Sequence, residues 1–343
     1  MKGMPIRFIS SKRLAAVALV SAISLVFAMT AGSFGYWGCS QAAPEPLVIG
    51  TMANAGDTLI FTAGEQEYFP DDALEVTLKT YVNGLAATNA MLAAEADLAY
   101  ATEFVVVGKA LEEEKIKIIA TYSKNNTVRL AGLKASGIEG VADLKGKKIG
   151  LSRGTINEFY LGRLLNLNRL SIDDVVLVDV KLTDLESALS SGNVDAVVAW
   201  SRNLYPLIQQ KGSDLFVWPA HSDQPAYGTL VARNEWLADH PETVERLLNS
   251  LARAQLYIES NPDATKAALQ KKLNFDDAYM AEVWAEYQFS LTLDQSLIIA
   301  MEDEARWMIA NDLTSETQVP DFLDYIYEDA LKTVKPESVS IIR

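Results

Sequence analysis

Short apolar runs alternate with helix-like segments from residue 47 onward, and this alternation constrains the fold more than any other feature of the sequence. In the first series, strand-like runs cover residues 47–50, 75–81, 97–100 and 117–122, and residues 88–95 are helix-like. In the second series, strand-like runs cover residues 146–151, 175–180 and 195–200, and residues 157–166 and 184–190 are helix-like. Alternation of this kind predicts an α/β fold in which helices cover the strands. Two series predict two α/β lobes.

The pattern becomes helical near residue 235. Predicted helices span residues 241–259, 262–272, 279–289, 294–311 and 320–334. Apolar residues recur in them at intervals of three and four, as in Val244, Leu247 and Leu251. We therefore expect a helical C-terminal tail whose core contains aromatic residues such as Trp284 and Tyr287.

The two series resemble each other at one point. Asp97 stands just before a strand in the first series, and Asp195 stands just before a strand in the second. The carboxyl end of each strand then directs a loop toward whatever lies between the lobes. Open α/β sheets bind ligands at those ends, so we expect a ligand between the lobes.

The first 38 residues have the pattern of an export signal. They contain four basic residues and no acidic ones, and an apolar run covers residues 14–29. A run of about 16 residues is short for a bilayer-spanning helix, which needs about 20. Cys39 follows at the position that bacterial lipoproteins lipidate, so we expect a lipid anchor there and a linker over residues 39–46. An ordinary cleavage near Ser40 and an uncleaved anchor are the alternatives.

Composition excludes several classes of function. The net charge is −15, with 30 basic and 45 acidic residues, which argues against a nucleic-acid partner. Removing residues 1–38 takes away four positive charges and changes −15 to −19. One cysteine and two histidines exclude an internal disulfide framework, a thiolate zinc cage and a His-rich metal site. Common nucleophile, zinc-protease and P-loop motifs are absent from the sequence. We therefore expect no catalytic residue, no metal and no cofactor.

Five motifs then occur in the order found in one family of binding proteins. They are DLKGKKIGLSRGT at residues 143–155 and companions at 92–100, 191–200, 231–242 and 261–264. Together they resemble the SsuA/THI5-like family, whose members bind sulfonates, taurine, nitrate or pyrimidine precursors for ABC importers. The resemblance covers residues 47 to about 335.

The resemblance implies a type II periplasmic binding protein fold, with two α/β lobes, a central cleft and a helical C-terminal tail. Lobe 1 is expected at residues 47–132 plus 229–343, and lobe 2 at residues 133–228. It also implies an extracytoplasmic, monomeric protein that binds a small molecule and works with ABC permease and ATPase subunits.

One candidate ligand-binding segment is a turn between a predicted strand and a predicted helix. Ser152, Gly154 and Thr155 lie in this turn. A helix N-terminus offers free N–H groups and a positive dipole end to an anion, and Gly154 lets the backbone approach closely. The alternative is ordinary N-capping by Ser or Thr.

A second candidate segment follows the strand at residues 97–100. Thr102 and Glu103 stand at its carboxyl end, where a carboxylate suits an amine or an N–H donor of the ligand. The alternative is a carboxylate that caps the next helix. Glu103 and the anion-favouring turn together favour a zwitterionic or heteroaromatic ligand over nitrate or a simple alkanesulfonate.

Five further residues are candidates for ligand contact. Asn54, Asn83 and Ser123 follow predicted strands, and asparagine is also a common turn residue. Trp200 ends a buried strand and either faces the ligand or packs in the core. Tyr227 lies near the expected second crossing between the lobes.

Capture of a small molecule for an ABC importer is the predicted function. A ligand-sensing lobe for a membrane signalling protein is one alternative. A pyrimidine-synthase-like enzyme on the same fold is another, but such enzymes need a reactive histidine and a cysteine-rich motif, and Cys39 lies outside the predicted fold.

Overall fold

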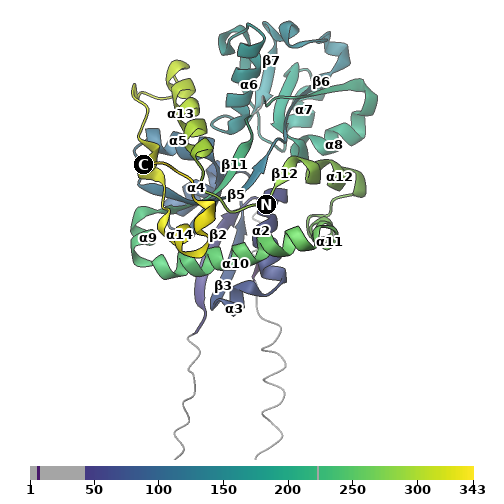
Figure 1. The fold of residues 1–343 in the computed structure, drawn as a ribbon. Helices are drawn as coiled ribbons and strands as arrows, with labels where there is room; N and C mark the ends of the chain where they lie inside the picture. Colours follow the sequence, from purple (N-terminus) through teal and green to yellow (C-terminus); the bar gives the residue numbers. More distant parts are fainter. Residues whose placement is uncertain (1–5, 8–42, 222–223) are drawn as a thin grey trace, which may run out of the picture.

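The computed structural model describes residues 6–7, 43–221 and 224–343 (Figure 1). Two sheets organise the chain. The first has the strand order β1-β3-β2-β4-β11-β5-β12 and the second has the order β10-β6-β9-β7-β8. The second sheet and its helices form the upper part of the molecule in Figure 1 and stack on the first.

The strands of the first sheet are named in the order of the sequence. They are β1 (Ile6–Arg7), β2 (Glu45–Thr51), β3 (Leu74–Thr80), β4 (Leu98–Thr102), β5 (Ile116–Asn125), β11 (Ala226–Arg233) and β12 (Tyr287–Gln288). The second sheet contains β6 (Val128–Leu133), β7 (Lys148–Leu151), β8 (Val176–Asp179), β9 (Ala196–Trp200) and β10 (Leu215–Pro219).

Both sheets share one topology. Strands β3, β2 and β4 run parallel, and β11 pairs antiparallel with both β4 and β5. Strands β8, β7 and β9 likewise run parallel, and β6 pairs antiparallel with both β9 and β10. In register, Ile49 of β2 faces Leu98 of β4, and Ile149 of β7 faces Ala196 of β9. The resemblance between the two halves of the sequence is therefore also one of topology.

The helices follow the strands in α/β order. They are α2 (Thr58–Glu65), α3 (Tyr68–Asp71), α4 (Gly84–Leu92), α5 (Glu103–Leu111), α6 (Ile156–Leu167), α7 (Leu185–Ser190) and α8 (Ser201–Lys211). The C-terminal part contains α9 (Asn234–Asp239), α10 (Pro241–Ser260), α11 (Pro262–Leu273), α12 (Asp277–Glu286), α13 (Gln295–Ala310) and α14 (Asp329–Val334). The helical tail predicted from the sequence is thus present.

The chain passes from the first sheet to the second between β5 and β6, and it returns between β10 and β11. The lobe boundary expected between residues 132 and 133 falls inside β6, and the one expected between 228 and 229 falls inside β11. Each crossing therefore lies a few residues earlier than expected. Periodicity could not reveal this, since a strand has the same pattern in either sheet.

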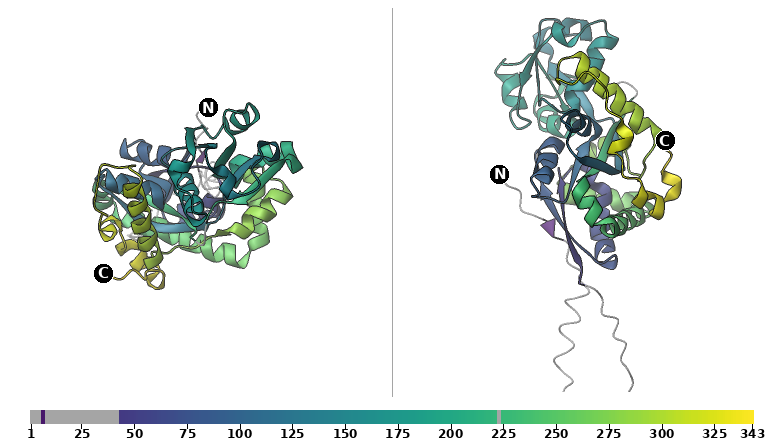
Figure 2. Two further views of the ribbon diagram at one scale, coloured as in Figure 1. Left: turned by 90° about the horizontal axis from the view of Figure 1, so that it is seen from above. Right: turned by 90° about the vertical axis from the view of Figure 1, so that its left-hand side faces the viewer.

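Helix α13 packs against both parts of the molecule. The Trp307 ring lies 6.2 Å from that of Phe104 on α5 and 5.5 Å from that of Phe159 on α6, measured between centroids. Arg163 of α6 also pairs with Asp303 of α13. In Figure 2, right, this yellow-green helix runs beside both parts.

Two predicted tail helices are wrong in extent. The helix expected over 279–289 ends at Glu286, because residues 287–288 form β12 and pair with the edge of β5. The helix expected over 320–334 is a 3₁₀ turn followed by α14. Between the two, the Tyr327 N–H donates to Ile118 of β5. The edge of the first sheet thus recruits backbone that helical periodicity assigned to helices.

The predicted export signal, Cys39 and the first half of the linker lie outside the described residues, apart from β1, which pairs with β3. The last two residues of the predicted linker, Glu45 and Pro46, belong to β2. Among the described helices, none combines the length and the apolar character that a bilayer crossing requires.

Candidate functional site

A cavity of about 240 Å³ lies at the carboxyl ends of strands from both sheets. This is the edge at which open α/β sheets bind ligands. The cavity is lined by Met52, Asn54, Ala55, Thr80, Tyr81, Val82, Thr127, Leu182, Trp200, Arg202, Asn203, Tyr279 and Tyr287.

The first sheet contributes the loop after β2. Asn54 caps the following 3₁₀ helix, accepting a hydrogen bond from the Gly56 N–H at 2.8 Å. Its own N–H donates to the carboxylate of Asp57, which also accepts from the Tyr122 hydroxyl. Burial raises the pKa of Asp57 to about 6. A fully buried carboxyl group therefore holds this wall of the cavity in place.

The second sheet contributes the end of β9 and the start of α8. Trp200 is half-buried, and Arg202 is exposed beside it. The guanidinium of Arg202 donates through Nη1 to the carbonyl oxygens of Met52, at 3.2 Å, and of Ala53. Ala53 has a φ of +49°, in the left-handed region. One side chain of the second sheet thus reaches across to the first-sheet loop.

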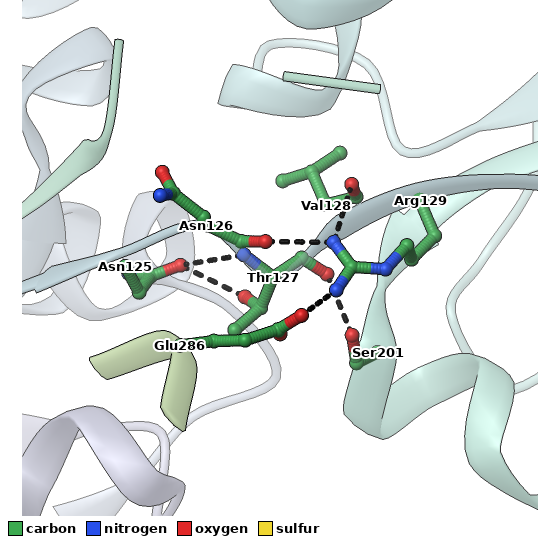
Figure 3. Close-up of polar contacts among 7 residues, drawn as sticks. All are labelled: Asn125, Asn126, Thr127, Val128, Arg129, Ser201 and Glu286. Atoms are coloured by element: carbon green, nitrogen blue, oxygen red, sulfur yellow. Dashed lines mark hydrogen bonds and ion pairs between the residues drawn. The ribbon is translucent and has the colours of Figure 1, made fainter. Parts of the chain in front are cut away.

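The crossing between β5 and β6 forms a polar junction beside the cavity (Figure 3). The Thr127 carbonyl accepts hydrogen bonds from the Ser201 N–H and hydroxyl at 2.8 and 2.9 Å. Arg129 donates to the backbone carbonyls of Asn126 and Val128 and pairs with the carboxylate of Glu286 at the end of α12. The crossing is thereby tied both to α8 and to the C-terminal tail.

The C-terminal tail contributes two tyrosines to the cavity. Tyr279 lies on α12 and Tyr287 on β12, and both line the cavity. The expectation that Tyr287 belongs to a helix core is wrong, because β12 pairs with β5 and brings this residue to the crossing.

Two of the residues singled out from the sequence, Asn54 and Trp200, line the cavity. Asn83 lies next to the lining residue Val82, where it caps α4 by accepting from the Ala86 N–H at 2.8 Å. Its capping role corresponds to the alternative interpretation of an asparagine in a turn.

Four others come together at the start of β11, away from the lining of the cavity. Strand pairing places Gly228 opposite both Thr102 of β4 and Ser123 of β5. The carboxylate of Glu103 accepts from the Tyr227 N–H at 3.0 Å. Thr102, Glu103 and Ser123 are at most 5% exposed.

Glu103 faces a second buried carboxyl group, Glu304 of α13. Both side chains are 0% exposed. Burial raises the pKa of Glu103 to about 8, and burial together with the charge of Glu103 raises the pKa of Glu304. At neutral pH this pair therefore holds a proton.

Ser152, Gly154 and Thr155 also lie outside the lining of this cavity, and the helix end near them is already occupied. The Gly154 N–H donates to Glu158 at 3.1 Å, and the Arg153 N–H donates to Asp179 at 3.2 Å. Two carboxylates of the protein thus accept from backbone N–H groups of this turn, just before α6 begins at Ile156. Ligand contact by these three residues stays a prediction.

The sequence analysis missed most of the lining residues. Arg202 and Asn203 come just after the end of β9, separated from it by Ser201, and Glu103 comes directly after the end of β4, so the strand-end rule could have found Arg202 and Asn203. Tyr279 had no such signal, because its place depends on how the C-terminal tail folds back. Within the described part of the chain, no group of three or more His, Cys, Asp or Glu side chains could hold a metal ion.

The sequence model of the family described as NMT1/THI5 like matches residues 54–265, which is more than half of the chain. The chain belongs to this family. The membership predicted from the five motifs is confirmed. This NMT1/THI5-like protein is 28% identical over 262 residues to a candidate binding protein of Brucella abortus, covering 73% of this chain and 78% of the other. It is 27% identical over 233 residues to a candidate thiamine biosynthesis protein of Haemophilus influenzae, covering 66% of this chain and 73% of the other.

Solved structures confirm the predicted periplasmic-binding-protein fold. The aliphatic sulphonate binding protein SsuA of Escherichia coli superposes with a TM-score of 0.69 at 17% identity, covering 83% of this chain and 98% of SsuA. The alkanesulfonate-binding protein SsuA of Xanthomonas axonopodis pv. citri, bound to MOPS, also gives 0.69 at 18% identity, covering 84% and 99%. The desulfurization enzyme DszB shares the fold, with a TM-score of 0.63 at 15% identity over 85% and 99%.

Proposed function

We propose that this protein is the extracytoplasmic solute-binding component of an ABC importer. It captures a small molecule, of the sulfonate, taurine, nitrate or pyrimidine-precursor class, between two lobes and delivers it to a permease. The observation that carries this proposal is the cavity itself, which is lined by loops of both sheets while Arg202 reaches across it.

Capture follows from the way the two sheets are joined. In the described part of the chain, two crossings connect them. The crossing between β5 and β6 lies beside the cavity, and the crossing between β10 and β11 leads into β11. A ligand that contacts loops of both sheets binds best when the sheets are close, so it shifts the population toward a closed form. The closed form is the state that docks on the permease.

The lining suits binding. It consists of aromatic, amide, hydroxyl and aliphatic side chains and one guanidinium. Such groups orient a ligand and exclude water from it. The enzyme DszB shows that this fold also supports catalysis, so the solute released after binding must be chemically unchanged for the proposal to hold.

The test combines thermal shift, small-angle scattering and analysis of the released solute. A panel of sulfonates, taurine, nitrate and pyrimidines is added to the purified protein. We expect at least one solute to raise the melting temperature in a saturable way, to reduce the radius of gyration and to be recovered intact. Chemical conversion of the bound solute, or no response to any solute, would contradict the proposal.

We also propose that residues 1–38, which include β1, are removed on export and that Cys39 carries the lipid anchor of a monomer. Two acyl chains are needed for stable attachment. Palmitate labelling of the expressed protein tests this, with Cys39→Ser as the variant that loses the label. Labelling that persists in Cys39→Ser would show that the anchor lies elsewhere.

A further inference from the structure

The cavity between the two sheets is lined by four aromatic side chains. Tyr81 follows β3, Trp200 ends β9, Tyr279 lies on α12 and Tyr287 lies on β12. Four rings therefore reach one small space from four separate elements. Aromatic rings attract one another in offset-stacked or edge-to-face arrangements, which gives a planar ligand ring several favourable contacts.

The charge of the lining is equally one-sided. Arg202 is the cationic side chain among the lining residues, and no acidic side chain lines this cavity. The hydrogen bonds that Arg202 makes within the described part of the chain go to the carbonyl oxygens of Met52 and Ala53. Both are neutral acceptors. A guanidinium has five N–H donors in a planar fork that matches a carboxylate or another oxyanion.

An anion would be a better partner for Arg202 than these carbonyls. Hydrogen bonds between charged groups are shorter and roughly twice as strong as neutral ones. Arg202 is exposed, so its guanidinium can turn toward a ligand without breaking a packed core. The bonds to Met52 and Ala53 link the two walls of the cavity through Nη1 alone, so an anion bound at the other N–H donors of the guanidinium would leave that link in place.

The size of the cavity sets the size of the ligand. An apolar cavity of about 150 Å³ is enough to hold benzene, and this cavity measures about 240 Å³. One ring with one polar substituent fits that space. Nitrate, by contrast, leaves the aromatic walls without a partner.

We propose that the ligand of this cavity is a small molecule with one aromatic ring and one anionic group, its ring held among Tyr81, Trp200 and Tyr287 and its anion on Arg202. The inference rests on the proposed solute-binding function and names the ligand class of the same site. The shared chemistry is an oxyanion on a ring, whether carboxylate, sulfonate or phosphate.

Isothermal titration of the purified full chain tests the proposal with matched probes. Benzoate, benzenesulfonate and phenyl phosphate carry both features, whereas benzamide lacks the charge and cyclohexanecarboxylate lacks the aromatic ring. We expect at least one of the three aromatic anions to bind, and the neutral and the saturated analogues to bind at least tenfold more weakly.

Variants assign the two features to their residues. Arg202→Gln should weaken binding of the aromatic anion at least tenfold, and Arg202→Lys should restore part of the loss. Tyr287→Leu should weaken the aromatic anion more than it weakens cyclohexanecarboxylate. Arg306→Gln is the matched control, since Arg306 is an exposed arginine on α13 that pairs with Glu302, away from the cavity lining. The melting temperatures of the ligand-free variants check their folding.

Any one of three results overturns the inference. None of the three aromatic anions binds; or benzamide or cyclohexanecarboxylate binds as tightly as the aromatic anions; or Arg202→Gln leaves the affinity for the aromatic anions unchanged. Failure here is distinguishable from failure of the proposed function, because an aliphatic or neutral solute that closes the protein would overturn only the ligand class.

Discussion

Asp97 and Asp195 make the same two hydrogen bonds in two different sheets. The Asp97 carboxylate accepts from the Val48 N–H at 2.7 Å, and the Asp97 N–H donates to the Val48 carbonyl at 2.9 Å. The Asp195 carboxylate accepts from the Lys148 N–H at 2.8 Å, and its N–H donates to the Lys148 carbonyl, also at 2.8 Å. Each aspartate therefore fixes the start of one strand against its parallel neighbour.

This equivalence predicts that removing either carboxylate lowers the stability by a similar amount and that the two effects add. Asp97→Ala and Asp195→Ala should each lower the free energy of unfolding by about 1–2 kcal/mol, since each leaves a backbone N–H without its charged acceptor. The double variant should show the sum within about 0.5 kcal/mol, because the two sites share no partner. Urea unfolding measures all three. A double variant no less stable than either single variant would refute the equivalence.

The ion pair between Arg129 and Glu286 should stabilise the crossing between β5 and β6. Their side chains are 10% and 19% exposed, and burial lowers the pKa of Arg129. Glu286→Gln removes the carboxylate that pairs with the guanidinium, although the charge of Glu282 still acts on it, and should destabilise the fold by about 2–4 kcal/mol. Glu302→Gln, at an exposed pair on α13, is the control and should cost less than about 1 kcal/mol. Equal effects in chemical unfolding would show that the crossing does not depend on this pair.

Two helical glycines that face α13 should respond to alanine with opposite signs. A Cβ on Gly162 of α6 would lie 2.4 Å from the Trp307 ring, whereas a Cβ on Gly108 of α5 would meet its nearest atom at 3.7 Å. Gly108→Ala should stabilise the protein by up to about 1 kcal/mol through helix propensity. Gly162→Ala should destabilise it by about 1–3 kcal/mol through overpacking. Thermal unfolding distinguishes them, and a stabilising Gly162→Ala would mean that α13 is free to shift.

The buried pair of Glu103 and Glu304 predicts a pH dependence of stability. Burial raises the pKa of Glu103 from 4.5 to about 8, so the folded state binds more protons than the unfolded state between about pH 5 and 8. The free energy of unfolding should therefore fall as the pH rises through that range, with a slope of up to about 1.4 kcal/mol per pH unit for one proton.

Glu304→Gln tests the assignment of this pH dependence. The amide is uncharged at every pH, so the stability of the variant should depend less on pH. Relative to the unchanged protein, its free energy of unfolding should be higher at pH 8 than at pH 5. Glu302→Gln, two residues earlier on α13 and exposed, should keep the profile of the unchanged protein. A profile that Glu304→Gln does not alter would place the responsible proton on Glu103 alone, whose pKa burial raises by itself, or on Asp57, whose raised pKa acts in the same direction.

The sequence determined the fold, because burial imposes a pattern on each element separately. Strands such as β4 and β9 are apolar in nearly every residue since helices cover both faces of their sheets, and α10 shows its apolar spacing over 20 residues. The motif at residues 143–155 identified the family for the same reason, since it forms one local strand, β7, and the turn that leads into α6.

The tertiary structure decided which side chains share the cavity. Asn54 and Trp200 follow strands of different sheets, and the strand-end rule found both. Tyr287 reached the cavity because the edge of β5 paired with backbone that helical periodicity assigned to a helix. Glu103 followed the same rule as Arg202, yet it lies buried against Glu304 and the Tyr227 N–H. A strand end places a residue at the correct edge of its sheet, but which neighbour packs over that edge depends on contacts between segments far apart in the chain.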